Sequence, residues 1–386
     1  MGTCDSNTKL KIKQRNLLKS KKNKKINFNK KQNITNSISS SSTKTSSNPN
    51  KNQFKPSKKP SSDFILPLNL AIYDDLSKFY TISNEIIGSG ASGIVSIGEN
   101  SAGKFAIKRI NKLKIKYPEE IIKEAEFAKK LNHKNIIKYY GVFEDLKYIS
   151  FIMELGEGGD LFDFIVNSPI GHLPLDITIE LTEQILSILV YLHYEIKIIH
   201  RDLKPENFLI TIDDNNNIQI KLIDFGMSTF YIQGKKLYEY LGTPNYAAPE
   251  IVLEDGYNEK VDIWAMGVIL FNMLTGFEPF KGKNEVELEN EIKCKEIDFE
   301  LIENEDMRNL CKKMLIRVED ERINAKDAYD MIKKIKKDRE RVYNEELKKM
   351  EGDKDKDDIN DNLIYKKERV EYNAFIDAMN TKFNFY

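Results

Sequence analysis

The stretch of this 386-residue sequence that says most about chemistry is the run His200–Asn207, which reads HRDLKPEN. Asp202 and Asn207 lie five positions apart, a spacing that suits a loop with a general base at one end and a metal ligand at the other. Lys204, between them, carries a positive charge that can neutralise a migrating phosphoryl group. Asp224, in the triplet DFG after a β-like run, offers a carboxylate to Mg²⁺, which prefers oxygen ligands. Together these residues predict phosphoryl transfer to a hydroxyl group.

A glycine-rich stretch at positions 88–95 reads GSGASGIV and fits the pattern G-x-G-x-x-G-x-V. Gly88, Gly90 and Gly93 allow the backbone to approach phosphate oxygens closely and to present N–H donors to them. A dinucleotide-binding fingerprint would need a helix at the last glycine, whereas strand-forming residues follow Gly93. Taken alone, the stretch leaves a plain flexible turn as an alternative.

Lys108 ends the apolar run FAIK shortly after the glycine stretch. A lysine in that place can reach the α- and β-phosphates of a nucleotide, although a lysine at the end of a strand can also be an ordinary surface residue. A phosphate-binding lysine needs an anion to orient it. On the helical pattern that follows, Glu124 has the best spacing, while helical rotation points Glu120 and Glu126 elsewhere.

The elements that must position these residues change in kind along the chain. Short β-like runs with one helical pattern (118–131) among them come first, at 80–87, 94–98, 104–110, 137–143 and 148–153. Long helical patterns dominate after position 155, at 175–195, 261–274, 286–294 and 306–315. We therefore expect an α+β protein in which a small sheet-rich lobe joins a larger helical lobe.

Composition sets limits on the class of protein. Hydrophobic residues make up 40% and charged residues 31%, as in a globular protein with polar tails. Cys4, Cys294 and Cys311 are the only cysteines, so the sequence indicates neither a disulfide framework nor a C-x-x-C zinc site. A reducing, intracellular setting is expected, without a secretory signal.

From about Phe79 to Tyr329 the motifs in this order resemble the eukaryotic protein kinase family. The resemblance implies a bilobal fold, with an antiparallel sheet and one major helix in the N-terminal lobe, and it implies ATP and Mg²⁺ as cofactors. It implies that Lys108 pairs with Glu124, that Asp202 accepts the substrate hydroxyl proton, and that Asn207 and Asp224 hold the metal.

Further roles follow from the same resemblance. Gly88, Gly90 and Gly93 would cover the ATP phosphates, and Lys204 with Thr243 of the triplet GTP resembles serine/threonine rather than tyrosine kinases. The expected adenine-pocket residues are Ile87, Val95, Ala106 and Leu209, with Met153 as gatekeeper and Glu154 and Leu155 as the hinge. Glu250 is expected to pair with Arg322, and the run 262–267 matches the buried central helix of the family.

Two stretches, 153–162 and 204–209, resemble the calcium- and calmodulin-dependent branch, and within it the calcium-dependent protein kinases of plants and protists. Asp160 and Glu206 match positions that attract a basic residue upstream of the phosphoacceptor, so basophilic protein substrates are expected. Glu239 stands where many kinases carry a phosphorylated threonine. Its carboxylate, paired with Arg201, would replace that phosphate and make loop phosphorylation unnecessary.

The segment 331–386 departs from the resembled family, whose members usually carry four EF-hands. One degenerate hand is predicted at most, either with a loop from 353 or with the exit 370–379, in which Ala374 replaces the bidentate glutamate. An acidic tail with a short amphipathic end is the alternative. The basic run 331–337 is interpreted as a solvated terminal helix, with an autoinhibitory or calmodulin-binding helix as the alternative. Calmodulin or a separate calcium sensor is therefore a candidate partner.

The first 62 residues are predicted to form a disordered arm, because they are rich in Lys, Asn and Ser and poor in aromatic residues. The start MGTCDS fits the N-myristoylation pattern at Gly2, and Cys4 is a candidate for palmitoylation. One acyl chain anchors only marginally, so the second chain or the lysines of the arm must add to it. We expect reversible attachment to the anionic cytoplasmic face of a membrane, and no nucleic-acid partner. A membrane-tethered kinase-fold scaffold with little catalysis, and a calcium sensor, are the alternative functions.

Overall fold

The computed structural model describes residues 66–67, 69–90, 93–156, 158–213, 217–352 and 363–383. All of them belong to one compact unit, which spans Pro60–Tyr386. The predicted arm at 1–62, with Gly2 and Cys4, lies outside the described residues, as does the tip of the glycine loop at 91–92.

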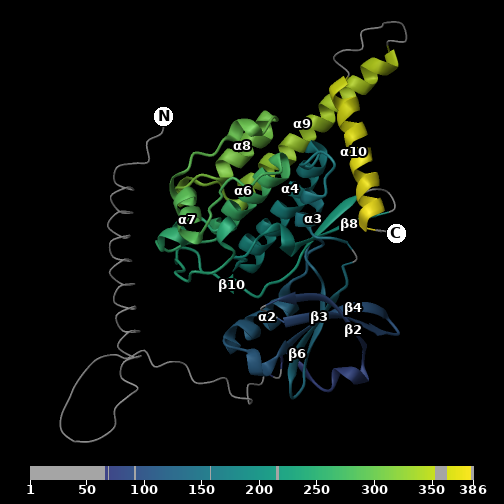
Figure 1. Ribbon diagram of the computed structural model, residues 1–386, viewed down its shortest axis with the longest axis vertical. Coiled ribbons are helices and arrows are strands. Elements are labelled where there is room, and N and C mark those ends of the chain that lie inside the picture. Colours follow the sequence, from purple (N-terminus) through teal and green to yellow (C-terminus); the bar gives the residue numbers. More distant parts are fainter. Residues whose placement is uncertain are drawn as a thin grey trace, which may run out of the picture. The chain divides into compact units, whose positions relative to one another are not determined.

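The N-terminal lobe is a six-stranded sheet in the order β1-β5-β6-β4-β3-β2. Figure 1 labels β2, β3, β4 and β6 of this sheet. Its strands are β1 (Ile72–Tyr73), β2 (Thr81–Gly90), β3 (Gly93–Asn100), β4 (Gly103–Asn111), β5 (Tyr139–Glu144) and β6 (Tyr148–Glu154). The pairs formed by β2 to β6 are antiparallel, as short connections allow, and β1 joins β5 in parallel. Each predicted β-like run coincides with a strand, which confirms the α+β expectation for this lobe.

Helix α2 (Pro118–Lys130) packs beside β5 and carries the predicted Glu124. Pro118 occupies its first turn, where a missing N–H costs nothing. Glu119 and Glu120 lie near its positive end and two lysines near its negative end, which suits the helix dipole. The inner face of the helix is fully buried at Ala125 and Phe127.

The C-terminal lobe is mainly helical and holds the largest apolar core. Its helices are α3 (Leu161–Val166), α4 (Leu175–Val190), α5 (Pro249–Leu253), α6 (Lys260–Thr275), α7 (Glu285–Cys294), α8 (Glu305–Met314) and α9 (Ala325–Gly352). Two short antiparallel strand pairs flank the run His200–Asn207, which we call the catalytic run. They are β7 (Ile198–Ile199) with β10 (Thr229–Phe230) and β8 (Phe208–Ile212) with β9 (Ile218–Leu222). Helix α6 is buried on nearly every side, so its apolar residues show no single stripe.

Gly276 ends α6 with a positive φ of 73°. A Cβ there would lie 1.9 Å from the Gly171 carbonyl oxygen, so a glycine is required both for the left-handed turn and for this close approach.

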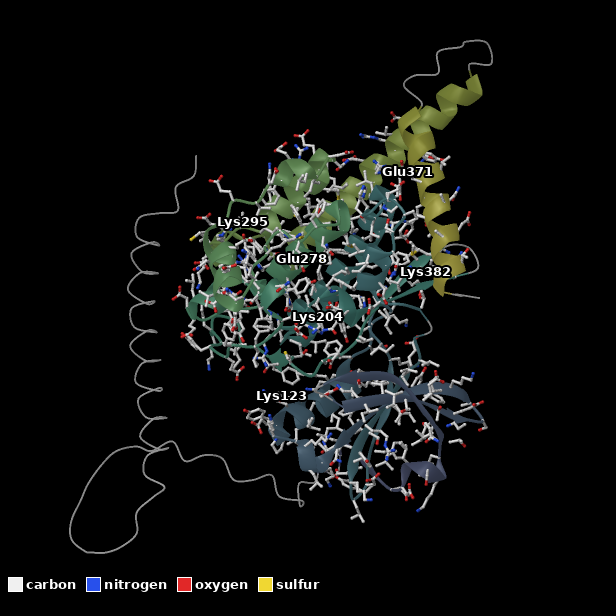
Figure 2. All side chains as sticks on the ribbon, in the orientation of Figure 1. Lys123, Lys204, Glu278, Lys295, Glu371 and Lys382 are labelled. Atoms are coloured by element: carbon white, nitrogen blue, oxygen red, sulfur yellow. The ribbon has the colours of Figure 1, made fainter. Side chains whose placement is uncertain are left out.

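Beyond the lobe, α9 continues through the basic run 331–337 as one helix, and a further helix, α10 (Leu363–Phe383), packs back onto the C-terminal lobe. Figure 2 labels Glu371 and Lys382 on this last helix. Its residues Phe375, Ile376 and Met379 are buried in the main core.

These helices correct two expectations. The run 331–337 is only partly solvated, because Ile332 is fully buried and Lys336 pairs with Glu183 at 2.6 Å. The EF-hand register that ends near 370–379 would need a loop where α10 is continuous, so it holds no calcium-binding loop. The register that begins at 353 lies outside the described residues. Among the described helices, none combines the length and the apolarity needed to cross a membrane.

Candidate active site

A cleft of about 890 Å³ lies where β2, β3, β4 and β6 face β8 and the catalytic run. The predicted residues that line it are Ile87, Gly88, Gly93, Val95, Ala106, Lys108, Met153, Glu154, Leu155, Asp160, Glu206, Asn207, Leu209 and Asp224. Gly90 pairs with Gly93 at the end of the β2–β3 hairpin. A Cβ at Gly93 would lie 2.7 Å from the Arg109 carbonyl oxygen at a φ of 136°, so only glycine fits there.

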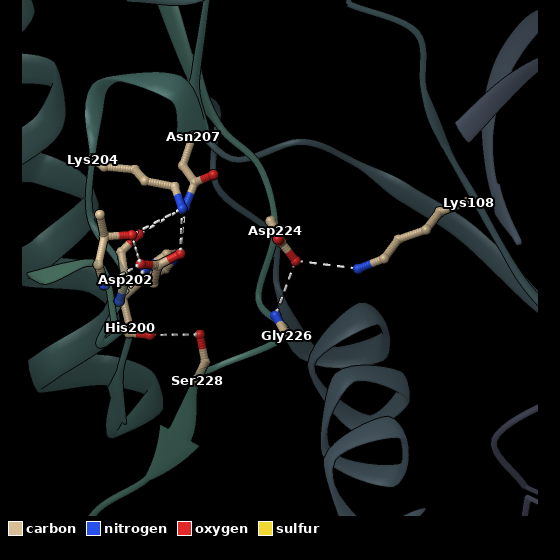
Figure 3. A network of polar contacts seen from close by, with 9 residues as sticks. Lys108, His200, Asp202, Lys204, Asn207, Asp224, Gly226 and Ser228 are labelled. Atoms are coloured by element: carbon tan, nitrogen blue, oxygen red, sulfur yellow. Dashed lines mark hydrogen bonds and ion pairs between the residues drawn. The ribbon is translucent and has the colours of Figure 1, made fainter. Parts of the chain in front are cut away.

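Lys108 meets two carboxylates at the inner end of the cleft. Its Nζ lies 2.6 Å from Glu124 Oε1 on α2. The same Nζ lies 3.2 Å from Asp224 Oδ1 (Figure 3). Burial alone would lower the pKa of Lys108, but the two carboxylates outweigh it and raise the pKa above the ordinary value. Lys108 is therefore a fixed positive charge, and the predicted pairing with Glu124 is present in the structure.

Asp202 is the centre of a polar network in the catalytic run. Lys204 Nζ donates to Asp202 Oδ2 at 2.9 Å and to Thr243 Oγ1 at 3.1 Å. The Thr243 hydroxyl in turn donates to Asp202 Oδ1 at 2.7 Å, and its backbone N–H donates to the same oxygen at 3.0 Å. From the sequence, the association of Lys204 with Thr243 rests only on the family resemblance. In the fold, both side chains bond to the carboxylate of Asp202.

Asn207 and Asp224 provide the oxygen atoms suited to a metal ion. The Asn207 amide nitrogen donates to the Asp202 carbonyl oxygen at 2.7 Å, which turns the amide oxygen toward Asp224 (Figure 3). The positive charge of Lys108 is the main cause that holds the pKa of Asp224 below its usual range, and the N–H of Gly226 acts in the same direction. Burial opposes both effects but does not outweigh them, so this candidate ligand is ionised. Within the described part of the chain, no three His, Cys, Asp or Glu side chains gather as a protein-only metal site. A donor set of one amide and one carboxylate fits Mg²⁺ that is also held by substrate phosphates.

Asp262 of α6 fixes the backbone at the start of the catalytic run. This carboxylate accepts the backbone N–H groups of His200 and Arg201, each at 2.9 Å, and contacts His193 Nε2 at 2.8 Å. Burial would raise the pKa of Asp262, but the His193 contact and the backbone N–H donors lower it overall. The strained backbone of Arg201, at a φ of 70°, is stabilised by these bonds.

Two ion pairs hold the segment between Asp224 and Glu250 in place. Arg201 donates to the carboxylate of Glu239. Glu250 accepts two parallel bonds from Arg322, at 2.7 and 2.9 Å, as the sequence predicts. Both arginine side chains are buried, so each needs its carboxylate partner.

The expected substrate-recognition carboxylates, Asp160 and Glu206, both line the cleft. Asp160 caps α3 through a 2.8 Å bond from the Asp163 backbone N–H. Burial raises the pKa of Asp160 above its ordinary value, although this cap and neighbouring N–H donors oppose the rise.

Tyr139 lines the cleft and was missed by the sequence interpretation. Its buried hydroxyl has no hydrogen-bond partner among the described residues. Strand register places Tyr139 opposite Met153, the expected gatekeeper. The sequence could have indicated Tyr139 only if β5 had been aligned with β6, which places Tyr139 opposite Met153.

Residues 81–332 match the family model of the protein kinase domain. This chain belongs to the protein kinase family. It is 35% identical over 289 residues to calcium-dependent protein kinase 4 of Plasmodium falciparum, covering 72% of this chain and 53% of that protein. It is 39% identical over 229 residues to calcium-dependent protein kinase 5 of Plasmodium berghei, covering 59% of this chain and 40% of that protein.

A third relative is myosin light chain kinase A of Dictyostelium discoideum, 35% identical over 264 residues, with 66% of this chain and 87% of that protein covered. The chain spans about half the length of the first calcium-dependent relatives. The kinase domain is thus related to those of calcium-dependent protein kinases, and its bilobal α+β fold agrees with the family match.

Proposed function

We propose that this chain is an ATP-dependent protein kinase that transfers the γ-phosphoryl group to serine or threonine hydroxyls. The observation that carries the proposal is the network in which Lys204 and Thr243 both bond to Asp202, together with the Lys108–Glu124 pair. These contacts are already formed, and positioning of this kind supplies most of the catalysis in phosphoryl transfer.

Each group has one task in this mechanism. Lys108 binds the α- and β-phosphates, and Asp202 orients the substrate hydroxyl and accepts its proton. Lys204 stabilises negative charge on the transferred group. Asn207 and Asp224 would hold Mg²⁺, which when bound neutralises phosphate charge. Thr243 holds Asp202 and Lys204 in one arrangement, through bonds of 2.7 and 3.1 Å.

The direct test compares wild type with Asp202→Asn in a phosphotransfer assay on a basic serine peptide. We expect kcat to fall about 10²- to 10⁴-fold, as for loss of a general base, while MgATP still binds in calorimetry. Equal activity of the two proteins would contradict the proposed role of Asp202. A wild-type protein that binds MgATP but phosphorylates no peptide would favour the scaffold alternative.

We further propose a preference for substrates with basic residues upstream of the phosphoacceptor. Asp160 and Glu206 support it, because both residues line the cleft. Asp160→Asn is the sharpest variant, since asparagine caps a helix as well as aspartate but carries no charge. We expect it to lower kcat/KM for an arginine-containing peptide about tenfold and to leave the alanine-substituted peptide unchanged. Equal losses on both peptides would contradict charge recognition.

Calcium-linked regulation and membrane attachment belong to the same proposal. The names of the calcium-dependent relatives support the first, and the pattern at Gly2 and Cys4 with its basic arm supports the second. Kinase assays with Ca²⁺ alone, and with Ca²⁺ and calmodulin, test the first, and a rate that neither addition changes would oppose it. Membrane fractionation of Gly2→Ala tests the second, and an unchanged membrane fraction would refute it.

A further inference from the structure

Residues 66–67 and 69–73 pack against the N-terminal lobe upstream of the expected domain boundary at Phe79. Its strand β1 pairs in parallel with β5, Ile72 opposite Phe143 and Tyr73 opposite Glu144. A parallel strand of two residues adds little hydrogen bonding of its own. Other contacts must therefore hold the segment in place.

Two leucines supply the first of these contacts. Leu66 is 2% exposed and Leu70 is 6% exposed, although both precede every strand of the sheet. They belong to one apolar cluster with residues of β4, β5, β6, α2 and the connection between β4 and α2, namely Ile110, Ile115, Ala125, Val142, Ile149 and Phe151. Ala125, the member from α2, is fully buried and follows Glu124 directly. The leucines thus share one apolar cluster with the helix that carries the partner of Lys108.

A buried carboxylate supplies the second contact. Glu144 is 3% exposed, and its Oε2 accepts the backbone N–H of Leu66 at 2.8 Å. Its Oε1 lies 2.7 Å from Lys112 Nζ, which is also buried. The hydroxyl of Tyr73 donates to the Leu66 carbonyl oxygen. A buried charge is costly unless it is fully bonded, so this arrangement fixes where Leu66 must lie.

We propose that residues 66–67 and 69–73 form a strap that positions α2, with Leu66 and Leu70 as positioning residues that keep Glu124 against Lys108. The inference rests on the proposed kinase function. The Lys108–Glu124 pair, at 2.6 Å, depends on where α2 lies. When the leucines are removed, α2 loses apolar contacts on one side and the pair is made less often. A misplacement of about 1 Å in such an arrangement can cost up to a hundredfold in rate.

The chain offers a matched control. Leu76 is also 2% exposed and lies close to the strap in sequence, but its cluster contains Ile107, Phe143 and Ile152 and no residue of α2. Leu66→Ala and Leu76→Ala therefore remove the same side chain from the same lobe at the same burial. Ile72→Ala, at a side chain within the strap that is 52% exposed, controls for the substitution itself.

The experiment measures three quantities in the full chain: thermal unfolding, hydrogen exchange of the α2 amides, and kcat with KM for ATP. All are taken well below the unfolding midpoint of the least stable variant. For Leu66→Ala and Leu70→Ala we expect α2 exchange to quicken about tenfold and kcat to fall about tenfold. Leu66→Met should restore both, because it refills the volume. Leu76→Ala should lower the midpoint without either effect.

Equal exchange and equal kcat for Leu66→Ala and Leu76→Ala would overturn the strap and leave an ordinary core. Hydrogen exchange needs no catalysis, so the strap is tested even in an inactive protein. A wild-type chain without phosphotransfer but with strap-dependent exchange of α2 would contradict the proposed function alone.

Discussion

The guanidinium of Arg201, next in sequence to the proposed general base Asp202, donates a hydrogen bond to the carboxylate of Glu239, 38 positions along the chain. The arginine side chain is 5% exposed and that of Glu239 is 59% exposed. Arg201 also donates through Nε to the Met227 carbonyl oxygen at 2.6 Å. A buried cation at this place thus has an anionic partner without any phosphate.

Glu239→Gln is predicted to lower kcat about tenfold, equivalent to about 1.4 kcal/mol of transition-state stabilisation. The amide keeps the shape of the side chain but loses the charge that compensates Arg201. Steady-state kinetics on protein free of loop phosphate measure the effect. Glu305→Gln, an exposed carboxylate in the first turn of α8, removes the same charge elsewhere and should leave kcat unchanged. Full activity of Glu239→Gln, or an obligatory loop phosphate, would refute the proposed role of Glu239.

Thr243 is predicted to act through its hydroxyl, which both accepts from Lys204 and donates to Asp202. Thr243→Ala should lower kcat about tenfold or more, because Asp202 and Lys204 lose their shared partner. Thr243→Ser keeps the hydroxyl and should retain most of the activity. Stopped-flow or steady-state rates with MgATP in excess measure both variants. If serine is as damaging as alanine, the methyl packing rather than the hydroxyl matters.

The pKa of Asp224 is predicted to depend on Lys108. Lys108, the largest influence on Asp224, holds its pKa below the ordinary value of 3.8 in the folded protein. Because the pKa of Asp224 is lower in the folded than in the unfolded protein, its ionisation stabilises the fold at pH values above the unfolded pKa of about 3.9. That contribution is lost as the pH falls through the folded pKa. In Lys108→Met the pKa of Asp224 should therefore rise. Carboxyl-carbon NMR titration measures it, with Asp224→Asn to assign the signal. An unshifted titration in Lys108→Met would mean that another group sets this pKa.

Helix α10 is predicted to be part of the folded unit. The ring of Phe375, 2% exposed, lies 4.9 Å from the ring of Phe164 on α3. Phe375→Ala should lower the free energy of unfolding by about 3–5 kcal/mol, as for other buried phenylalanines. Val370→Ala, on the same helix but 63% exposed, should change it by less than about 0.5 kcal/mol. Chemical denaturation of both variants measures the difference. Equal stability of the two would show that α10 does not dock in solution.

The elements were predictable where local pattern and burial agree. The helical patterns 118–131 and 261–274 correspond to α2 and α6 within one residue at each end. The upstream strap was not predicted, because a stretch this short does not show what covers it, and Leu66 and Leu70 are buried by residues farther along the chain. The packing of α10 was missed for the same reason, since its partner Phe164 is more than 200 positions away.

The sequence by itself determined the chemistry: which residues can hold phosphate and metal and which can accept a proton. Because motif spacing is local, residue types in a fixed order can be recognised from the sequence without a structure. Only the tertiary structure decided that Lys108 meets Asp224 across 116 positions and that Lys204 and Thr243 share Asp202. It also placed Glu144 beneath the strap. Such pairings depend on how the sheet, α2 and α6 pack around one core, and no run of neighbouring residues records that packing.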